Sequence, residues 1–399
     1  MSQFPSSASA MPAPALSRGL TLVMAVACGV AIANIYYCQP MLGILSTDFH
    51  GSALVGLVPT ATQLGYALGL FLLVPLGDLR DRRRIIVTQF AGLGLALLLA
   101  ALAPTAAILA GASLLVGAGA TVAQQIVPLA AAMAGPDRRG ATIGTVMSGL
   151  LCGILLSRTV AGFVGTAAGW RMMFWLAVPL AAAGALAMRL ALPASTARDP
   201  IPYGQALRSL AHLWREEPTL RRAALTQAGL FGAFIAFWTS LALHLQTLTM
   251  GAEVAGMFGV IGAVGVVAAP LAGRLADRRG PQVVITLGAG LTLAAFAVFA
   301  AAPGLIGLIV GVTLLDFGVQ SAMVSHQHIV YGLRPEARNR LNTLFMTVMF
   351  LGGSAGSAGS TAAWAWGGWL AVSALGAALA AAALALRAGA HRAAGSASR

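Results

Sequence analysis

The stretch GDLRDRR at residues 77–83 returns as GRLADRR at residues 273–279, which is 196 positions further along the chain. A second pair of similar stretches, PDRR at residues 136–139 and PEAR at residues 335–338, is separated by 199 positions. Two separate matches at nearly the same offset indicate that the chain consists of two related halves.

Long apolar segments lie on both sides of each repeated stretch. They cover residues 20–45, 53–76, 85–103, 106–134, 141–165, 170–192, 222–250, 254–273, 283–302, 304–331, 341–363 and 367–387. A membrane span needs about 20 apolar residues, and a backbone in hydrocarbon must satisfy its own hydrogen bonds, so each segment is expected to be a helix. The sequence predicts an all-α polytopic membrane protein of twelve transmembrane helices in two pseudo-symmetric six-helix bundles.

Composition supports a membrane protein and argues against other classes. Only 9% of the residues are charged and 58% are hydrophobic, whereas about a quarter of the residues of a soluble protein are charged. The net charge of +13 lies in loops between apolar segments, so we expect the lipid bilayer as a partner and no nucleic acid. No Walker motif, catalytic triad or metal-ligand spacing of the three cysteines is present, so we expect no enzyme activity, cofactor or metal.

The arginines predict the orientation of the chain. Alternate loops contain clusters of them, whereas the loops on the other side contain Arg171 alone. Cytoplasmic loops of membrane proteins are enriched in Lys and Arg. We therefore expect a multi-pass protein of a bacterial-type inner membrane with both termini in the cytoplasm.

The same pattern divides the chain into five parts: a cytoplasmic tail (1–19), a first six-helix bundle (20–192), a cytoplasmic linker (193–221), a second bundle (222–387) and a second tail (388–399). Within the linker, residues 203–215 are amphipathic and are predicted to form a helix on the membrane surface. The small residues GGSAGSAGS at 352–360 predict a helix face that allows close packing of a neighbour. Two such bundles need no further subunit, so we expect a monomer.

The repeated stretch resembles the loop motif G-x-L-x-D-R-x-G-R of the major facilitator superfamily, and the resemblance covers nearly the whole chain. The matching residues are Gly77, Leu79, Asp81 and Arg82 in the first copy, and Gly273, Leu275, Asp277, Arg278 and Gly280 in the second. Arg84 stands where the family usually has glycine. The resemblance implies a secondary transporter that works by alternating access, in which Asp81, and more weakly Asp277, stabilises one conformation near a helix terminus.

Gly169-Trp170-Arg171 followed by Phe174 resembles the start of helix 6 in the drug:proton antiporter branch, which implies proton-coupled efflux of small amphipathic molecules. Two positions depart from that branch: Ser113 replaces its usual arginine, and Arg158 replaces a proline in its glycine-rich helix 5. An uptake carrier for an organic anion or sugar, with Arg158 as solute ligand, is therefore an alternative. A transporter-like solute sensor is another, although the linker offers little cytoplasmic surface.

Arg158 and Asp316 are the ionisable groups, histidines aside, that fall well inside apolar segments. Charges inside a membrane are costly and usually functional. We predict that Asp316 binds the transported proton, and that Arg158 lowers its proton affinity or binds an anionic solute. A purely structural role for the two remains open, as does a direct or water-mediated contact between them. His326, near the inner end of the same helix, is a candidate proton relay.

The resemblance also implies that helices 1, 4, 7 and 10 line the solute cavity. Polar and aromatic residues on these helices are the cavity candidates: Asn34, Tyr37, Gln39, Gln124, Gln125, Trp238, His244, Gln246 and Gln320. For each of them, packing between helices is an equal alternative.

Overall fold

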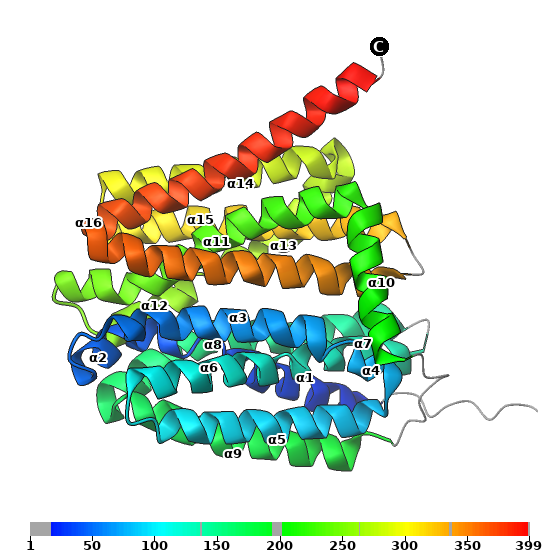
Figure 1. Ribbon diagram of the computed structural model, residues 1–399, viewed down its shortest axis with the longest axis horizontal. Coiled ribbons are helices and arrows are strands. Elements are labelled where there is room, and N and C mark those ends of the chain that lie inside the picture. Colours follow the sequence, from blue (N-terminus) through cyan, green and yellow to red (C-terminus); the bar gives the residue numbers. More distant parts are fainter. Residues whose placement is uncertain (1–16, 136–137, 194–201, 263, 335–336, 398–399) are drawn as a thin grey trace, which may run out of the picture.

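The computed structural model describes residues 17–135, 138–193, 202–262, 264–334 and 337–397, and these ranges contain helices and no strand. Parts of the second repeated pair, Pro136, Asp137, Pro335 and Glu336, lie outside the described residues, as do most of the first tail and much of the early linker. The helices run side by side, and the two halves of the chain form two layers (Figure 1).

The first half contains α1 (Arg18–Ala33), α2 (Cys38–Asp48), η1 (Ala53–Gly56), α3 (Leu57–Leu72), α4 (Leu76–Leu79), α5 (Arg82–Ala101), α6 (Ala106–Ala120), α7 (Val122–Met133), α8 (Arg139–Ala168) and α9 (Trp170–Ala191). The linker helix α10 (Tyr203–Glu216) follows. The second half contains α11 (Pro218–Thr247), α12 (Ala252–Ile261), α13 (Val264–Arg279), α14 (Pro281–Ala301), α15 (Leu305–Leu333) and α16 (Arg338–Ala397).

The number of apolar helices is compatible with the sequence prediction. Ten described helical segments are long and apolar enough to cross a membrane. One of them belongs to α16, in which Gly367 and Gly368 leave the helical conformation, so α16 is two helices joined at a kink. Counting its two arms separately, and α12 with α13 as a further span, fits the predicted twelve.

Small residues allow the helices of the first half to approach closely. A Cβ on Gly29 of α1 would lie 2.6 Å from the carbonyl oxygen of Gly149, and one on Gly153 would lie 2.6 Å from the Cα of Gly29. Further along α8, a Cβ on Gly162 would lie 3.0 Å from the Cα of Gly256 on α12. The glycine-rich face of α8 therefore packs on α1 in one part and on the second half of the chain in another.

The second half repeats the packing of α1 on α8. A Cβ on Gly352 of α16 would lie 2.6 Å from the Cα of Ala228 on α11, and one on Gly356 would lie 2.6 Å from the Cα of Gly232. Gly149 and Gly352 are 203 positions apart, as are Gly29 and Gly232. This confirms the small-residue face predicted at 352–360 and shows the internal repeat at the level of helix contacts.

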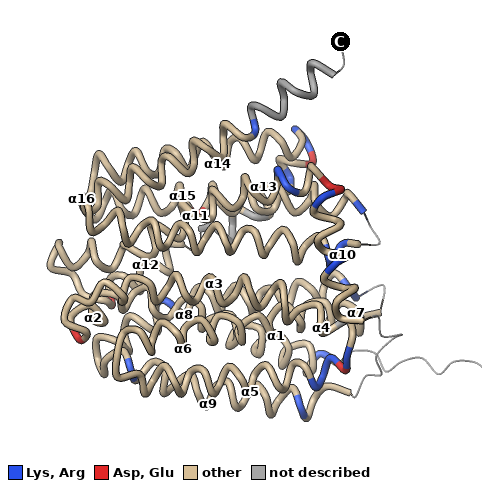
Figure 2. The backbone as a smooth tube through the Cα atoms, in the orientation of Figure 1, with Lys and Arg blue, Asp and Glu red and all other residues tan. Residues whose placement is uncertain are grey.

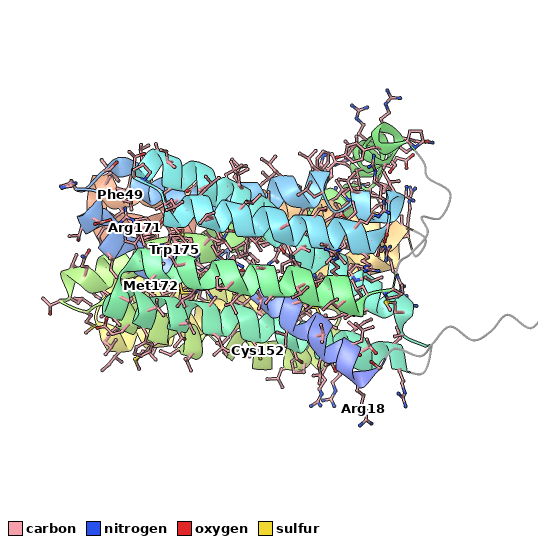
Figure 3. All side chains as sticks on the ribbon, turned by 90° about the horizontal axis from the view of Figure 1, so that it is seen from below. Arg18, Phe49, Cys152, Arg171, Met172 and Trp175 are labelled. Carbon is pink, nitrogen blue, oxygen red and sulfur yellow. The ribbon has the colours of Figure 1, made fainter. Side chains whose placement is uncertain are left out.

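Most of the described arginines gather at one end of the molecule, where α10 also lies (Figure 2). Arg18 lies at this end, and Arg171 lies with Phe49 at the opposite one (Figure 3). The predicted linker helix is confirmed as α10, which packs through Leu210 and Leu213 on Leu341 of α16. We call the end that contains α10 the arginine end.

Two kinds of contact hold the linker. Arg334 donates to Glu217 over 2.6 Å and contacts Glu216 at 3.2 Å, and the hydrogen bond to Glu217 raises the pKa of Arg334 above its ordinary value. On the other side, the Tyr203 hydroxyl donates to the carbonyl oxygen of Leu72 in α3 over 2.7 Å.

We predict that Gly153→Ala destabilises the protein, because the new methyl group overlaps the backbone of α1. Overpacking costs about 1–3 kcal/mol of the free energy of unfolding, which thermal or denaturant unfolding in detergent would measure. Gly144→Ala is the matched control on the same helix, since a Cβ there meets no atom within 4 Å, and it should be neutral or stabilising. Equal stability of the two variants would contradict the packing described.

Candidate solute and proton site

The Arg158 side chain of α8 lies between the two halves of the chain. Its guanidinium carbon is 4.4 Å from the ring centroid of Tyr36 and 4.0 Å from that of Trp238 on α11. Its Nε donates to Gln39 Oε1 over 2.9 Å. Arg158 is only 4% exposed, so two aromatic rings and an amide replace water around a buried cation.

These contacts suit arginine because its planar guanidinium stacks on ring faces while its N–H groups donate in the plane. A cation–π contact contributes about 2 kcal/mol or more when the cation is desolvated. Tyr36 belongs to the turn between α1 and α2, where the interrupted helix brings the ring toward α8. The contact with Trp238 joins the first half to the second.

Asp316 of α15 reaches the same region from the second half. A Cβ on Gly262, at the interruption between α12 and α13, would lie 3.3 Å from Asp316 Oδ1 and 3.4 Å from Cζ2 of Trp238. Arg158 and Asp316, both described, form no direct salt bridge, although their charges interact electrostatically. The sequence left open whether Arg158 and Asp316 pair directly. In the structure they interact electrostatically without a direct salt bridge.

Several buried polar atoms of this cluster have no hydrogen-bond partner among the described residues. They are Gln39 Nε2, Arg158 Nη2, Trp238 Nε1 and Asp316 Oδ2. Buried polar groups are nearly always paired, so a group of unpaired ones marks a place that can bind a polar ligand. Three donors and one acceptor in one cluster are what a small polar group or a proton would need to bind.

Two predicted cavity residues, Gln39 and Trp238, thus belong to the Arg158 cluster. Two others are used elsewhere: Asn34 donates to the carbonyl oxygen of Val30 in its own helix over 2.7 Å, and Tyr37 is buried in the core. Gln320 is half-buried and lies four residues after Asp316 on α15.

Gln124 and Gln125 lie nearer the arginine end. Gln124 donates to the Tyr66 hydroxyl over 3.1 Å, and Gln125 donates to the carbonyl oxygen of Leu73 over 2.9 Å. Both line a cavity of about 680 Å³. They therefore do not contact Arg158 but face a separate space.

The candidates His244, His326 and Gln246 also lie apart from the cluster. His244 stacks on Trp369 with centroids 4.1 Å apart and bonds through Nε2 to the Pro303 carbonyl oxygen. Gln246 is exposed. His326 is buried and bonds through Nδ1 to Gln227 Oε1 over 3.0 Å. It follows Asp316 by ten residues, about 15 Å along a helix, so the two side chains are not in contact.

Sequence reasoning missed Tyr36 and Gln63. Tyr36 was hidden because its position depends on the interruption between α1 and α2. Gln63 of α3 is fully buried with both side-chain polar atoms unpaired. A lone amide in an apolar segment, three residues from Thr60 and from Tyr66 on one helix face, was a signal that could have found it.

The two copies of the repeated motif differ in structure. Asp81 is the N-cap of α5 and accepts a hydrogen bond from the Arg83 N–H over 3.0 Å, and Arg82 Nε donates to the Gly77 carbonyl oxygen. Asp277 instead lies exposed in the last turn of α13, where a carboxylate meets the negative end of the helix dipole. The remaining motif residues follow this division: Leu79 is buried and Gly77 packs on Gln125, whereas Gly273 has open space and Arg278 is exposed.

Comparisons with known proteins agree with this architecture. The chain is 40% identical to an uncharacterized transporter, YgaY, of Escherichia coli over 344 residues, 85% of this chain and 87% of the relative. It is 27% identical over 215 residues to a chloramphenicol efflux pump of Mycobacterium tuberculosis, about half of each chain (53% and 52%). The fold resembles that of a bacterial homolog of the human lysosomal transporter Spinster, solved inward-facing and unoccupied, with a TM-score of 0.70 and 15% identity over 93% of this chain and 94% of that one.

The family model of the Major Facilitator Superfamily matches residues 24–357. Together with two related bundles and a polar cluster between them, this match identifies a multi-pass membrane transporter, and the chain belongs to the Major Facilitator Superfamily.

Proposed function

We propose that the protein is a monomeric, proton-coupled secondary transporter that exports small amphipathic molecules by alternating access. The observation that carries the proposal is the buried Asp316 carboxylate, with Oδ2 unpaired, near the cation Arg158. The residue ranges 20–192 and 222–387 are the two bodies that rock against each other.

Asp316 is suited to proton coupling because two opposing effects act on such a carboxyl. Loss of water favours the neutral acid, and a neighbouring cation favours the carboxylate. Arg158 belongs to the first bundle and Asp316 to the second, so rocking changes the distance between them. Protonation of Asp316 then depends on the conformation, which is the requirement for coupling.

Access to the site is proposed to be from the arginine end, which we assign to the cytoplasmic face of the inner membrane. The bundles are joined toward the opposite end, where Thr159 donates to the Gly256 carbonyl oxygen over 3.0 Å and Thr361 donates to that of Gly56 over 2.8 Å. The cavity of about 680 Å³ lies at the arginine end. This arrangement supports an inward-facing state.

Asp81 is proposed to contribute to switching between states. It caps α5 next to the cavity-lining residue Arg82, so its contacts are placed where the bundles must meet when the arginine end closes. Asp277 is exposed and does not cap a helix, so a weaker role in switching is proposed for it. Export is supported by the similarity to a chloramphenicol efflux pump.

Uptake of an organic anion is a second candidate, which the unpaired donors Arg158 Nη2, Gln39 Nε2 and Trp238 Nε1 favour. An anion bound to Arg158 would take the place of the Asp316 charge and so favour the protonated acid. Solute and proton would then move together, in contrast to the exchange expected for an exported cation or neutral molecule. The direction of proton movement separates the two candidates.

Asp316→Asn is expected to abolish proton movement driven by solute. The purified protein would be placed in liposomes with a pH-sensitive dye inside and challenged with cationic drugs, sugars and organic acids. In the wild type, one class of compound should move protons across the liposome membrane. Proton movement opposite to the solute indicates exchange, and movement with the solute indicates cotransport. Glu216→Gln, which removes an exposed carboxylate of the linker helix, is the control. Undiminished proton movement in Asp316→Asn would remove this residue from the coupling mechanism.

Trp238→Leu is expected to lower the free energy of unfolding by about 2 kcal/mol more than Trp238→Phe, because only phenylalanine keeps a ring over the Arg158 guanidinium. Thermal unfolding in detergent would measure the difference. In an Arg158→Gln background the gap between the two substitutions should shrink. A gap that persists there would show that Trp238 acts through packing alone.

A further inference from the structure

The cavity of about 680 Å³ at the arginine end has a basic lining. Four arginines line it, Arg82 and Arg139 from the first bundle and Arg338 and Arg340 from the second. No aspartate or glutamate is among the described residues that line it. We call this space the vestibule.

The positions of these arginines increase the local positive potential. Each lies within the first three residues of its helix, α5, α8 or α16, and none of these helices has an acidic residue in its first turn. The N-terminus of a helix carries a partial positive charge and favours anions. The Asp81 carboxylate caps α5, so two positive helix ends, those of α8 and α16, and four arginines lie around one space.

The rest of the vestibule wall is apolar or carries uncharged amide and hydroxyl groups. Leu70, Val74 and Pro75 line it from the first bundle, and Leu210 lines it from the linker helix. A ligand that matches this surface has a negative group at the arginines and an apolar part on these side chains. Basic pockets between transmembrane helices on the cytoplasmic side are known to bind acidic headgroups, and arginine binds such groups with two parallel hydrogen bonds.

We propose that the vestibule is a binding site for an amphipathic anion, whose phosphate, sulfonate or carboxylate group lies between the arginines of the two bundles. The site is distinct from the Arg158 cluster and does not depend on proton coupling. Two sources share this chemistry, the headgroup of an anionic membrane lipid and a soluble amphipathic anion. Because the arginines come from both bundles, a bound anion also lowers the repulsion between them when this end closes.

Binding would be measured on the purified full-length protein in a neutral detergent, from the shift in thermal unfolding as ligand is added. The lipid arm compares phosphatidylglycerol with phosphatidylcholine of the same acyl chains. The soluble arm compares naphthalene-1-sulfonate with the neutral 1-naphthalenemethanol. We expect the wild type to bind at least one anionic probe about tenfold or more tightly than its uncharged counterpart, a difference that shrinks at high salt.

The test variant is Arg139→Gln with Arg340→Gln, which removes one vestibule charge from each bundle. The control is Arg189→Gln with Arg279→Gln, which removes two exposed arginines outside the vestibule wall, one from each bundle. The test variant should bind the anion about tenfold or more weakly, while the control keeps the wild-type affinity.

The two arms identify the source of the ligand. Selective binding of phosphatidylglycerol assigns a lipid site, selective binding of the sulfonate assigns a soluble ligand, and both results support the proposal. Equal affinity for charged and uncharged probes overturns it. So does an equal loss in the two double variants, which would show a general effect of surface charge.

Discussion

The buried Arg158 guanidinium is the constraint on which the centre of the structure depends. A permanent cation at this depth cannot face lipid, so the α8 face that carries it must turn toward the protein interior. Tyr36, Gln39 and Trp238 then have to come from three further segments to replace the water that it loses. Two of these segments belong to the first half and one to the second. The site is consequently a product of the interface and is absent from either half alone.

The second requirement is close approach of helix backbones. The glycines of α8 and α16 meet small residues of α1 and α11 at equivalent positions of the two halves. Hydrocarbon provides no hydrophobic drive for helices to associate, so surface contact between backbones must supply the attraction. Repeating the same contact at a fixed spacing gives two similar bundles from two diverged sequences, and it places α8 where Arg158 can reach α11.

Most of the fold could be predicted from the sequence because membrane spans and arginine-rich loops follow from solvent physics that acts on every residue. The linker helix and the small-residue faces were likewise visible. The site could be predicted only in part: Arg158 and Asp316 stand out as charges in apolar segments, and the cavity candidates Gln39 and Trp238 lie beside Arg158. His244 and Gln246 do not lie there. The resemblance identifies which helices line the cavity, but it gives neither how far along the helix a residue lies nor which way its side chain points. The position of Tyr36 depends on the interruption between α1 and α2, which the sequence did not reveal. Asp277 lies within α13, whereas its counterpart Asp81 caps the N-terminus of α5.

The linker helix has unequal attachments, with ion pairs and leucine contacts to the second bundle and the Tyr203 hydrogen bond to α3. In the structure, α10 is therefore attached more extensively to the second bundle than to the first. Burial raises the pKa of Tyr203 above its ordinary value, which favours the protonated hydroxyl that donates this hydrogen bond. Any movement of the first bundle away from α10 would have to break this one hydrogen bond, so Tyr203 is the point at which the linker tethers α3.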